Sequence, residues 1–349
     1  MTTTTTPDPG RNANTNTNGE GDGGPSPAGG RGAGRAKVVV VLVAVPFALA
    51  LALWAFAWPA ARTAPHHLPV AVASTTGDPA AAAPVTAALD DAGDAFDTRA
   101  YPSGDDARTA VEQRDVYAAF LVSADGDVEL LTASAAAPAV AQFLTESAPE
   151  HVPAGTELTV TDLVPSPSTD PRGSALAASV LPLSVAGVVT GGIVTALRLR
   201  GPRALATVTA AAALSGLAAT TLTHTWLGIL TGNWWAEAGV ITLTVWATAS
   251  VITGLAAHLG SVGLSLGSLT VVLLGNAWAA VNTSPYLQPP PLGLLGQWLP
   301  PGAGANFLRS TAYFDGNTPG TPVLTLTLWT LTGTALILLA GRRERGARP

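Results

Sequence analysis

One serine in an apolar part of the chain has the spacing that hydrolases use around a nucleophile. Gly263-Leu-Ser265-Leu-Gly267 matches the pattern G-x-S-x-G, which exposes a serine on a strand-to-helix turn and requires a histidine base and an acid. Here the pattern lies at the predicted start of a membrane helix, and His224 and His258 are predicted near helix ends. Small residues at this spacing let membrane helices approach closely. We therefore interpret Gly263 and Gly267 as packing positions, with an intramembrane hydrolase as the remaining alternative.

Two short clusters contain residue types that bind metal ions. Asp125-Gly-Asp127-Val-Glu129 resembles the opening of a calcium loop, but the glycine at the sixth position and the glutamate at the twelfth are missing. We interpret this cluster as a solvated hairpin turn. His66 and His67 are adjacent, and neighbouring side chains of an extended chain point apart. The sequence therefore predicts no catalytic residues, no metal site and no cofactor.

An energy source within the chain is not indicated either. The phosphate-binding pattern GxxxxGK[ST] has no match, because the one lysine, Lys37, is followed by valine. Proton relays in membranes use buried acidic or histidine side chains, whereas the predicted spans offer only Glu237, at a span boundary, and the amides Asn276 and Asn282. Cysteine is absent, which excludes disulfides and thiol catalysis. No basic patch suited to nucleic acid is present.

One long apolar stretch, residues 174–308, dominates the chain and would supply most of the elements that position any functional residues. Only 11% of the 349 residues are charged, against roughly 25% in soluble domains. Residues 174–308 carry four charged side chains, Arg198, Arg200, Arg203 and Glu237. A charge at the centre of a membrane helix costs roughly 2.5–3.5 kcal/mol on insertion scales. Avoidance of charge over this length indicates lipid as the solvent.

Six membrane-spanning helices are predicted. Their approximate ranges are 38–58, 174–197, 204–223, 238–257, 264–281 and 321–340. Arginine and lysine cluster before the first span, between the second and third, and after the last, which places both termini in the cytoplasm. We expect a disordered cytoplasmic tail over 1–36, a first transmembrane helix over 37–59 and a basic cytoplasmic tail over 342–349. A cleaved signal peptide is the alternative for the first helix, but its apolar run is longer than usual.

The remaining membrane region, 174–341, is expected to be a five-helix domain. Within it, residues 285–317 are rich in proline and glycine yet apolar. Such a segment is too irregular for a span and too apolar for an exposed loop, so we expect it to be re-entrant or interfacial.

Residues 60–173 have an ordinary soluble composition and contain most of the carboxylates. Apolar runs at 68–74, 96–101, 116–122, 128–132 and 157–164 predict strands, and 79–91, 105–113 and 137–147 predict helices. Asp125-Gly126 predicts an antiparallel hairpin between the third and fourth strands. The order predicts an extracytoplasmic α/β domain with a mixed sheet, inserted between the first and second spans.

This layout resembles the type-2 ATP-binding-cassette (ABC) exporter permeases, particularly the phage-infection-protein-like (Pip-like) branch. The resemblance rests on the arrangement of one span, a large outer domain and five spans, and on loose local patterns. These are LPVAVAS (68–74), DDARTAVEQRDVYAAFLV (105–122), LGSVGLSLG (259–267) and WLPPGAGANFLRSTAYF (298–314). It implies a dimer that docks on a separate ATPase, with the loop containing Arg198, Arg200 and Arg203 as the coupling contact. The departures are that this loop is short and that no amphipathic helix precedes the first span.

The sequence thus predicts an α-helical membrane protein of the bacterial cell membrane that carries an inserted α/β domain. The function that we expect is that of a permease subunit, which moves an amphiphilic or polymeric substrate outward with energy from a partner ATPase. The alternative is a non-transporting scaffold or secretion accessory protein whose outer domain binds a partner.

Overall fold

The computed structural model describes residues 29–153, 155–317 and 320–346. It divides into two compact units, residues 1–50 and 51–349. Helix α1 (Gly29–Ala60) starts in the first unit and ends in the second, and it begins before the predicted start at residue 37. Residues 1–28 of the predicted tail lie outside the described part of the chain. At its end, Trp54 stacks on Trp58 and meets the edge of Trp278 at 6.1 Å.

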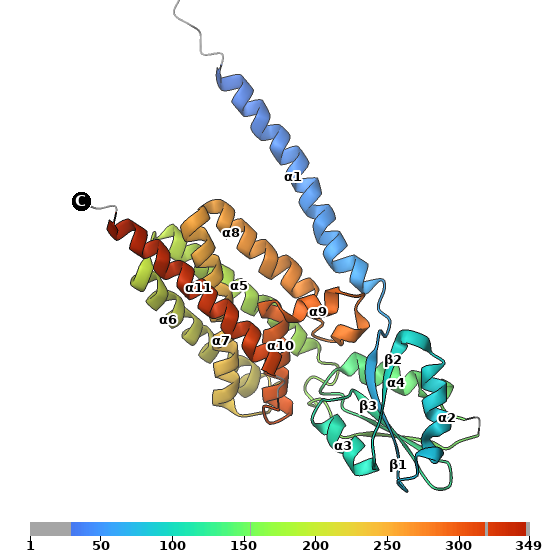
Figure 1. The fold of residues 1–349 in the computed structure, drawn as a ribbon. Helices are drawn as coiled ribbons and strands as arrows, with labels where there is room; N and C mark the ends of the chain where they lie inside the picture. Colours follow the sequence, from blue (N-terminus) through green and yellow to red (C-terminus); the bar gives the residue numbers. More distant parts are fainter. Residues whose placement is uncertain (1–28, 154, 318–319, 347–349) are drawn as a thin grey trace, which may run out of the picture. The chain divides into compact units, whose positions relative to one another are not determined.

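A mixed five-stranded sheet forms the α/β part of the described chain, in the order β2-β1-β3-β4-β5 (Figure 1). The strands are β1 (Leu68–Ser74), β2 (Phe96–Ala100), β3 (Ala118–Val122), β4 (Val128–Thr132) and β5 (Leu158–Asp162). Strand β3 pairs with β4 in antiparallel register, Phe120 facing Leu130, and the other three pairings are parallel. The predicted mixed sheet and hairpin are therefore confirmed, and Gly126 supplies the positive φ of 90° that the hairpin turn uses.

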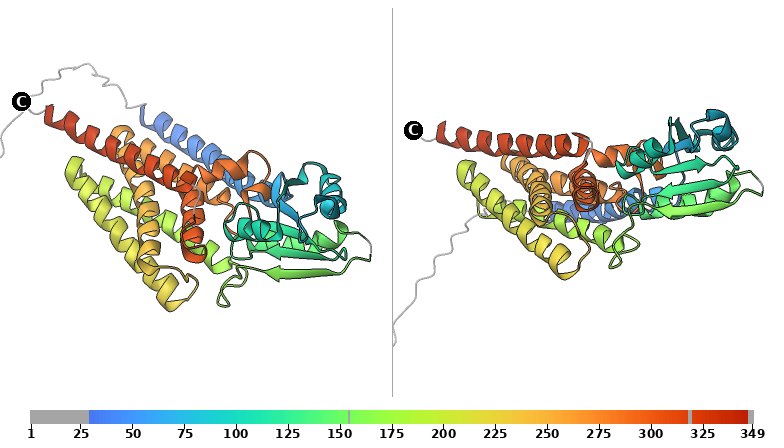
Figure 2. Two further views of the ribbon diagram at one scale, coloured as in Figure 1. Left: turned by 60° about the horizontal axis from the view of Figure 1, so that its bottom comes forward. Right: turned by 90° about the horizontal axis from the view of Figure 1, so that it is seen from below.

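Helices cover both faces of the sheet (Figure 2). The helices are α2 (Pro79–Asp90), α3 (Gly104–Glu112) and α4 (Pro138–Ser147). Leu89 of α2 and Leu144 of α4 pack with Phe120 on one face, whereas Val111 of α3 packs with Leu131 on the other. Local signals start two of these helices: Asp78 accepts a hydrogen bond from Ala80 N, and Ser103 accepts one from Asp106 N.

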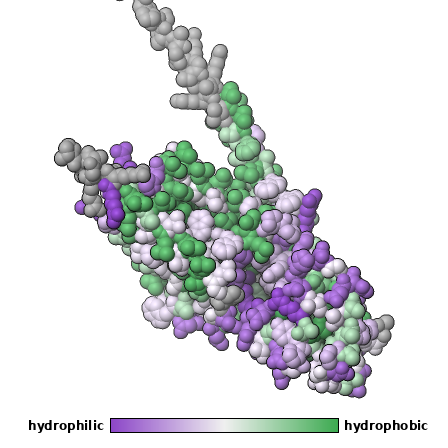
Figure 3. Space-filling view, in the orientation of Figure 1, coloured by the Kyte–Doolittle hydropathy of each residue, from purple (hydrophilic) through white to green (hydrophobic). Residues whose placement is uncertain are grey.

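Five helices among the described residues are long and apolar enough to cross a membrane. Their apolar ranges are Val41–Ala60, Ser174–Ala196, Gly201–Trp226, Trp234–Leu259 and Gly320–Arg342. They belong to α1, α5 (Ser174–Ala196), α6 (Gly201–Thr220) with its π-helical extension η3 (Thr221–Trp226), α7 (Trp234–Leu259) and α11 (Gly320–Gly346). On the face drawn in Figure 3, apolar residues predominate over the helical bundle α5–α11, whereas polar residues are more frequent toward the sheet.

The predicted span 264–281 takes a different form. It is a shorter apolar helix, Ser261–Gly275, built from α8 (Ser261–Ser268) and the π-helical segment η4 (Leu269–Gly275). The Asn276 side-chain amide donates to Val271 O and Val272 O, at 3.3 and 3.1 Å. These two bonds hold the Asn276 side chain against the preceding turn of the segment, just before the chain leaves the helix.

Helix α7 is the centre of the bundle, and 72% of the residues in its most apolar stretch are buried. Small residues allow its neighbours to approach: Gly187 of α5 faces Thr248, Gly216 of α6 faces Thr242, and Gly333 of α11 faces Ser250. A methyl group at any of these glycines would overlap atoms of α7. Close backbone approach through small residues is the usual way in which membrane helices pack.

The segment 285–317 is more regular than the sequence predicted. It forms the 3-10 turn η5 (Pro285–Leu287), α9 (Leu292–Gln297) and α10 (Pro300–Tyr313). Its two ends reach the α/β part: Leu287 packs into the core beneath α2 and α4, and Phe314 packs into the core beneath α3. Ala64 N and His66 N donate to the carbonyls of Leu287 and Tyr286. This segment therefore joins the sheet to the helical bundle.

Candidate functional site

The three arginines predicted as a coupling contact lie together in the short connection between α5 and α6. Arg198 has a positive φ of 53°, Arg200 immediately precedes α6, and Arg203 lies in its first turn; all three side chains are exposed. Arg200 Nη1 donates to Ala257 O at 3.4 Å, near the end of α7. The structure therefore brings the predicted residues into one exposed cationic turn.

This turn lies at the end of α5 that is remote from the sheet. The connection 163–173 leads from β5 to the first turn of α5, where Asp170 Oδ1 and Oδ2 accept hydrogen bonds from Ala175 N and Leu176 N at 3.1 and 2.9 Å. The helix then runs for 23 residues, which is ~35 Å at ~1.5 Å per residue. The end of α11 packs beside the turn, Gly341 against Gly201, and adds the exposed Arg342. The bundle is thus basic at the end away from the sheet.

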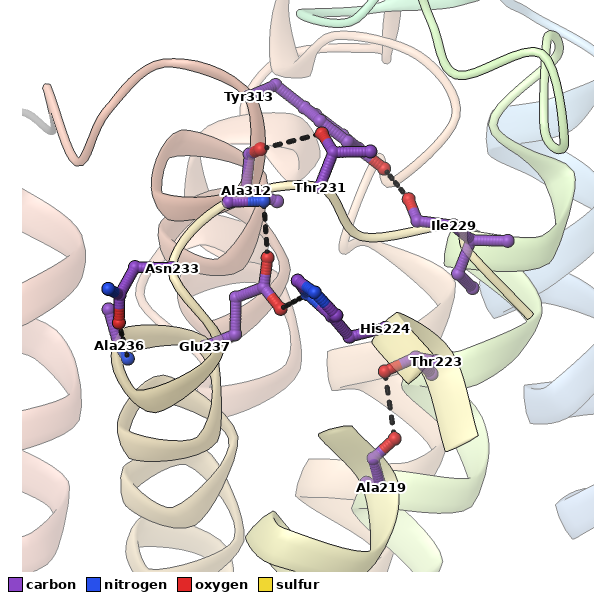
Figure 4. Close-up of polar contacts among 11 residues, drawn as sticks. Ala219, Thr223, His224, Ile229, Thr231, Asn233, Ala236, Glu237, Ala312 and Tyr313 are labelled. Atoms are coloured by element: carbon purple, nitrogen blue, oxygen red, sulfur yellow. Dashed lines mark hydrogen bonds and ion pairs between the residues drawn. The ribbon is translucent and has the colours of Figure 1, made fainter. Parts of the chain in front are cut away.

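A buried carboxylate lies at the opposite end of the bundle. Glu237, in the first turn of α7, has no exposed surface. Its Oε2 is 2.8 Å from His224 Nδ1, and its Oε1 accepts a 2.8 Å hydrogen bond from Gly232 N (Figure 4). The positive end of the α7 dipole stabilises negative charge at this position. Because η3 carries His224 beyond the end of α6, this contact ties α6 to α7.

The loop between these helices is fastened to the end of α10. Tyr313 Oη donates to Ile229 O at 2.6 Å, and Thr231 Oγ1 donates to Ala312 O at 3.1 Å (Figure 4). Burial raises the pKa of Tyr313 to about 12, so the hydroxyl keeps its proton and remains a donor at neutral pH. Glu237, His224 and Tyr313 together therefore hold α6, α7 and α10 at the end of the bundle nearest the sheet.

The sequence placed Glu237 at a span boundary and assigned it no role. The missed signal is Asn233, whose side chain accepts a hydrogen bond from Ala236 N at 3.0 Å and starts α7 at Trp234. Asparagine is a preferred residue for starting helices. With the helix beginning there, Glu237 falls in the first turn instead of the loop.

Beside this buried pair, α7 and α10 enclose a groove of about 510 Å³. Val240 and Leu243 of α7 and Phe307 of α10 provide apolar walls, and the polar residues of its lining are Asn233, Thr311 and Asp315. Ligand pockets commonly have volumes of roughly 300–1,000 Å³ with mostly apolar walls. The groove therefore has the size and lining to accept the apolar part of a small amphiphile.

The other motifs are placed as follows. Gly263 and Gly267 pack against α7, on Leu255 and Ile252, whereas Ser265 is exposed; this confirms the packing interpretation of the glycines. Asp125 and Asp127 belong to the turn between β3 and β4 and line a cavity of about 290 Å³ with α2.

The histidine pair and the acidic cluster do not assemble into a metal site in the described residues. The histidine pair at 66–67 lies just before β1, and His67 has a positive φ of 51°. Among the residues that the structure describes, no three histidine, aspartate or glutamate side chains lie close enough together to hold a metal ion.

Comparison of the sequence with protein-family models finds no match, and neither functionally characterised proteins nor solved structures match it. The fold and the site geometry are therefore the basis for the function proposed below.

Proposed function

We propose that the chain crosses the bacterial cell membrane six times, with both termini in the cytoplasm and the α/β part outside. The observation that supports this orientation is the distance of the arginine turn from the sheet. Helix α5 spans ~35 Å, enough to cross the ~30 Å hydrocarbon core between Asp170 and Arg198. Positively charged loops remain preferentially in the cytoplasm, which assigns the carboxylate-rich sheet to the other side.

The shorter helix Ser261–Gly275 makes the sixth crossing in this arrangement. It starts directly after α7 ends at Leu259, near the arginine turn. The chain that follows it reaches Trp278, which contacts Trp54, and Asn282, whose carbonyl accepts a hydrogen bond from Ala139 N of α4. A helix that is shorter than the bilayer is accommodated by local thinning and by flanking residues.

Within this topology, the function that we propose is that of a permease subunit of an ABC-type exporter of the Pip-like branch. A separate ATPase would dock on Arg198, Arg200 and Arg203, and the chain would act as a dimer. The groove between α7 and α10 would receive an amphiphilic substrate near the outer surface. Coupling from the arginines to the groove would pass along α7, since Ala257 of α7 contacts Arg200 and Val240 of α7 lines the groove.

Affinity purification from native membranes in a mild detergent tests this proposal. We expect an ATPase to co-purify with the full chain, and its recovery to fall at least tenfold for the triple variant Arg198→Gln, Arg200→Gln, Arg203→Gln. The matched control replaces Arg99, Arg108 and Arg172, which belong to the α/β part and the connection after it, with glutamine. The proposal fails if no ATPase is recovered, or if both triple variants recover it equally.

The scaffold function is a second candidate, and the cavity of about 290 Å³ in the α/β part favours it. This cavity lies between α2, with Ala81 and Val85, and the hairpin turn at Gly126. A scaffold predicts that Ala81→Trp, which fills the cavity, abolishes the phenotype that the chain complements in a deletion strain, whereas the arginine triple variant complements it. A permease predicts the reverse pattern.

A further inference from the structure

Two arginines from distant parts of the sequence meet where the sheet joins the helical bundle. Arg114 follows α3 in a left-handed conformation with φ 64°, and Arg309 lies on α10 with 4% of its surface exposed. A non-glycine residue in this conformation costs roughly 1–3 kcal/mol at such a site. Among the described residues, neither guanidinium has a carboxylate within ion-pair distance.

Each of the two guanidinium groups has a buried nitrogen without an acceptor among the described residues. Arg114 Nη2 donates to Asn306 Oδ1 at 2.9 Å, and its Cζ lies 5.2 Å from the centre of the Phe314 ring. Arg114 Nη1 is buried with no partner, and the same holds for Arg309 Nε among the described residues. A buried donor without an acceptor costs roughly 1–3 kcal/mol, and more when it is charged.

Both groups remain charged at neutral pH. Burial and the charge of Arg114 lower the pKa of Arg309 to about 10, which still lies far above neutrality. Burial also lowers the pKa of Arg114. Asp170 is the weakest of the named influences on the pKa of Arg309, and its oxygens accept hydrogen bonds from the first amides of α5. The junction therefore contains two positive charges that repel each other, and neither has a carboxylate within ion-pair distance among the described residues.

A small cavity of about 20 Å³ lies between these groups and is lined by Arg114, Arg309, Tyr117 and Gln297 among others. The neighbouring amides are already engaged: Gln297 Nε2 donates to Ala279 O, and Asn306 Nδ2 donates to Gln297 Oε1. Among the described lining residues, the buried donors without an acceptor are Arg114 Nη1 and Arg309 Nε. About 10–15 Å³ holds one water molecule, so the cavity admits one particle of that order and is too small for phosphate or a carboxylate-bearing ligand.

We propose that this junction binds one chloride ion between Arg114 and Arg309. The ion supplies the missing negative charge and accepts hydrogen bonds from the unpartnered nitrogens of the two guanidinium groups. Because Arg114 belongs to the α/β part and Arg309 to α10, the ion fastens the sheet to the bundle. Bromide, which is only slightly larger, replaces chloride, whereas gluconate is excluded by size.

Thermal unfolding of the full chain in detergent, compared between sodium chloride and sodium gluconate at equal ionic strength, tests this site. We expect the midpoint to rise by a few degrees with chloride and to saturate as the site fills. Bromide should give the same rise. The variant Arg309→Gln should lose the dependence on the anion, whereas Arg172→Gln, at an exposed arginine, should keep it.

If Arg309→Gln does not fold, Arg114→Gln serves as the second variant, since glutamine tolerates the left-handed backbone as arginine does. Bromide soaked into crystals should give an anomalous peak between the two guanidinium groups. Equal midpoints in chloride and gluconate overturn the proposal, and so does a chloride effect that persists in both arginine variants. An ordered water in the cavity with no bromide peak overturns it as well.

Discussion

Arg114 and Asn306 lie 192 residues apart in the sequence, yet Arg114 Nη2 donates a 2.9 Å hydrogen bond to Asn306 Oδ1. The contact joins the turn after α3 to α10, and therefore the sheet to the helical bundle. Asn306 also donates to Gln297 Oε1 at 3.2 Å, which links α10 to α9. One amide side chain thus satisfies partners on two elements at the junction.

The first prediction concerns this amide. We expect Asn306→Leu, which keeps the volume but removes both hydrogen bonds, to lower the free energy of unfolding by about 1–3 kcal/mol, because Arg114 Nη2 loses its acceptor. Chemical unfolding in detergent measures the change, and hydrogen exchange should speed up in α10 and in the turn after α3.

Asn317 provides the matched control for this variant. It is exposed and donates to Gln113 O at 3.3 Å, so it also links the end of α10 to the α/β part. We expect Asn317→Ala to change stability by no more than about 0.5 kcal/mol. Equal effects of the two substitutions would show that burial of the Arg114 contact is unimportant.

The second prediction concerns the buried pair of Glu237 and His224. Glu237→Ala leaves Gly232 N and His224 Nδ1 without an acceptor, and breaking such a buried contact costs about 3–5 kcal/mol. Glu237→Gln should cost less, because its carbonyl oxygen still accepts from Gly232. Unfolding midpoints of both variants, with the exposed Glu150→Ala as the control, measure the difference. A change in Glu237→Ala as small as in the control would contradict the role assigned to the pair.

The third prediction compares Gly216 of α6, which lies at the contact with α7, with Gly239 of α7, which lies outside that contact. A methyl group at Gly216 would overlap the Thr242 side chain and the Ala238 carbonyl, whereas one at Gly239 meets nothing within 4 Å. We expect Gly216→Ala to destabilise the chain by about 1–3 kcal/mol through forced separation of the helices. Gly239→Ala should be neutral or stabilising by up to ~1 kcal/mol. The same unfolding assay ranks the two variants, and the reverse order would be inconsistent with this packing.

The fourth prediction tests the proposed orientation. The chain has no cysteine, so single substitutions report accessibility without background. We expect Asp105→Cys on α3 to react with an impermeant maleimide in intact cells, and Arg203→Cys to react only after permeabilisation. Both positions are exposed, so burial does not limit either reaction. Labelling of Arg203→Cys in intact cells would show that the arginine turn lies outside the cell and would contradict the proposed topology.

The secondary structure of the α/β part followed from local information. Runs of apolar residues predicted the strands, and the stretches between them predicted the helices, to within a few residues. The helix-starting roles of Asp78 and Ser103 emerged only from the structure. The mixed pairing also followed, because Asp125-Gly126 requires an antiparallel hairpin while the helices between the other strands favour parallel crossovers.

Hydropathy was less decisive for the bundle. It indicated the apolar helices well, but it predicted a full-length span at 264–281, where the helix Ser261–Gly275 is shorter. It also missed the helices of 285–317, because proline and glycine there were taken as signs of irregular backbone. Pro300 and Pro301 instead occupy the first turn of α10, where proline is tolerated.

The sequence by itself determined the apolar helical character of the chain, the ranges of the strands and helices in the α/β part and the cluster of arginines at 198–203, because hydropathy, charge and turn residues act over a few neighbouring positions. The tertiary structure alone decided which side chains meet. Arg114 with Arg309, and His224 with Glu237, are paired by the packing of α10 and α7 against distant segments. Their burial, and with it the free energy of an unpaired charge, is a property of that packing that no local pattern carries.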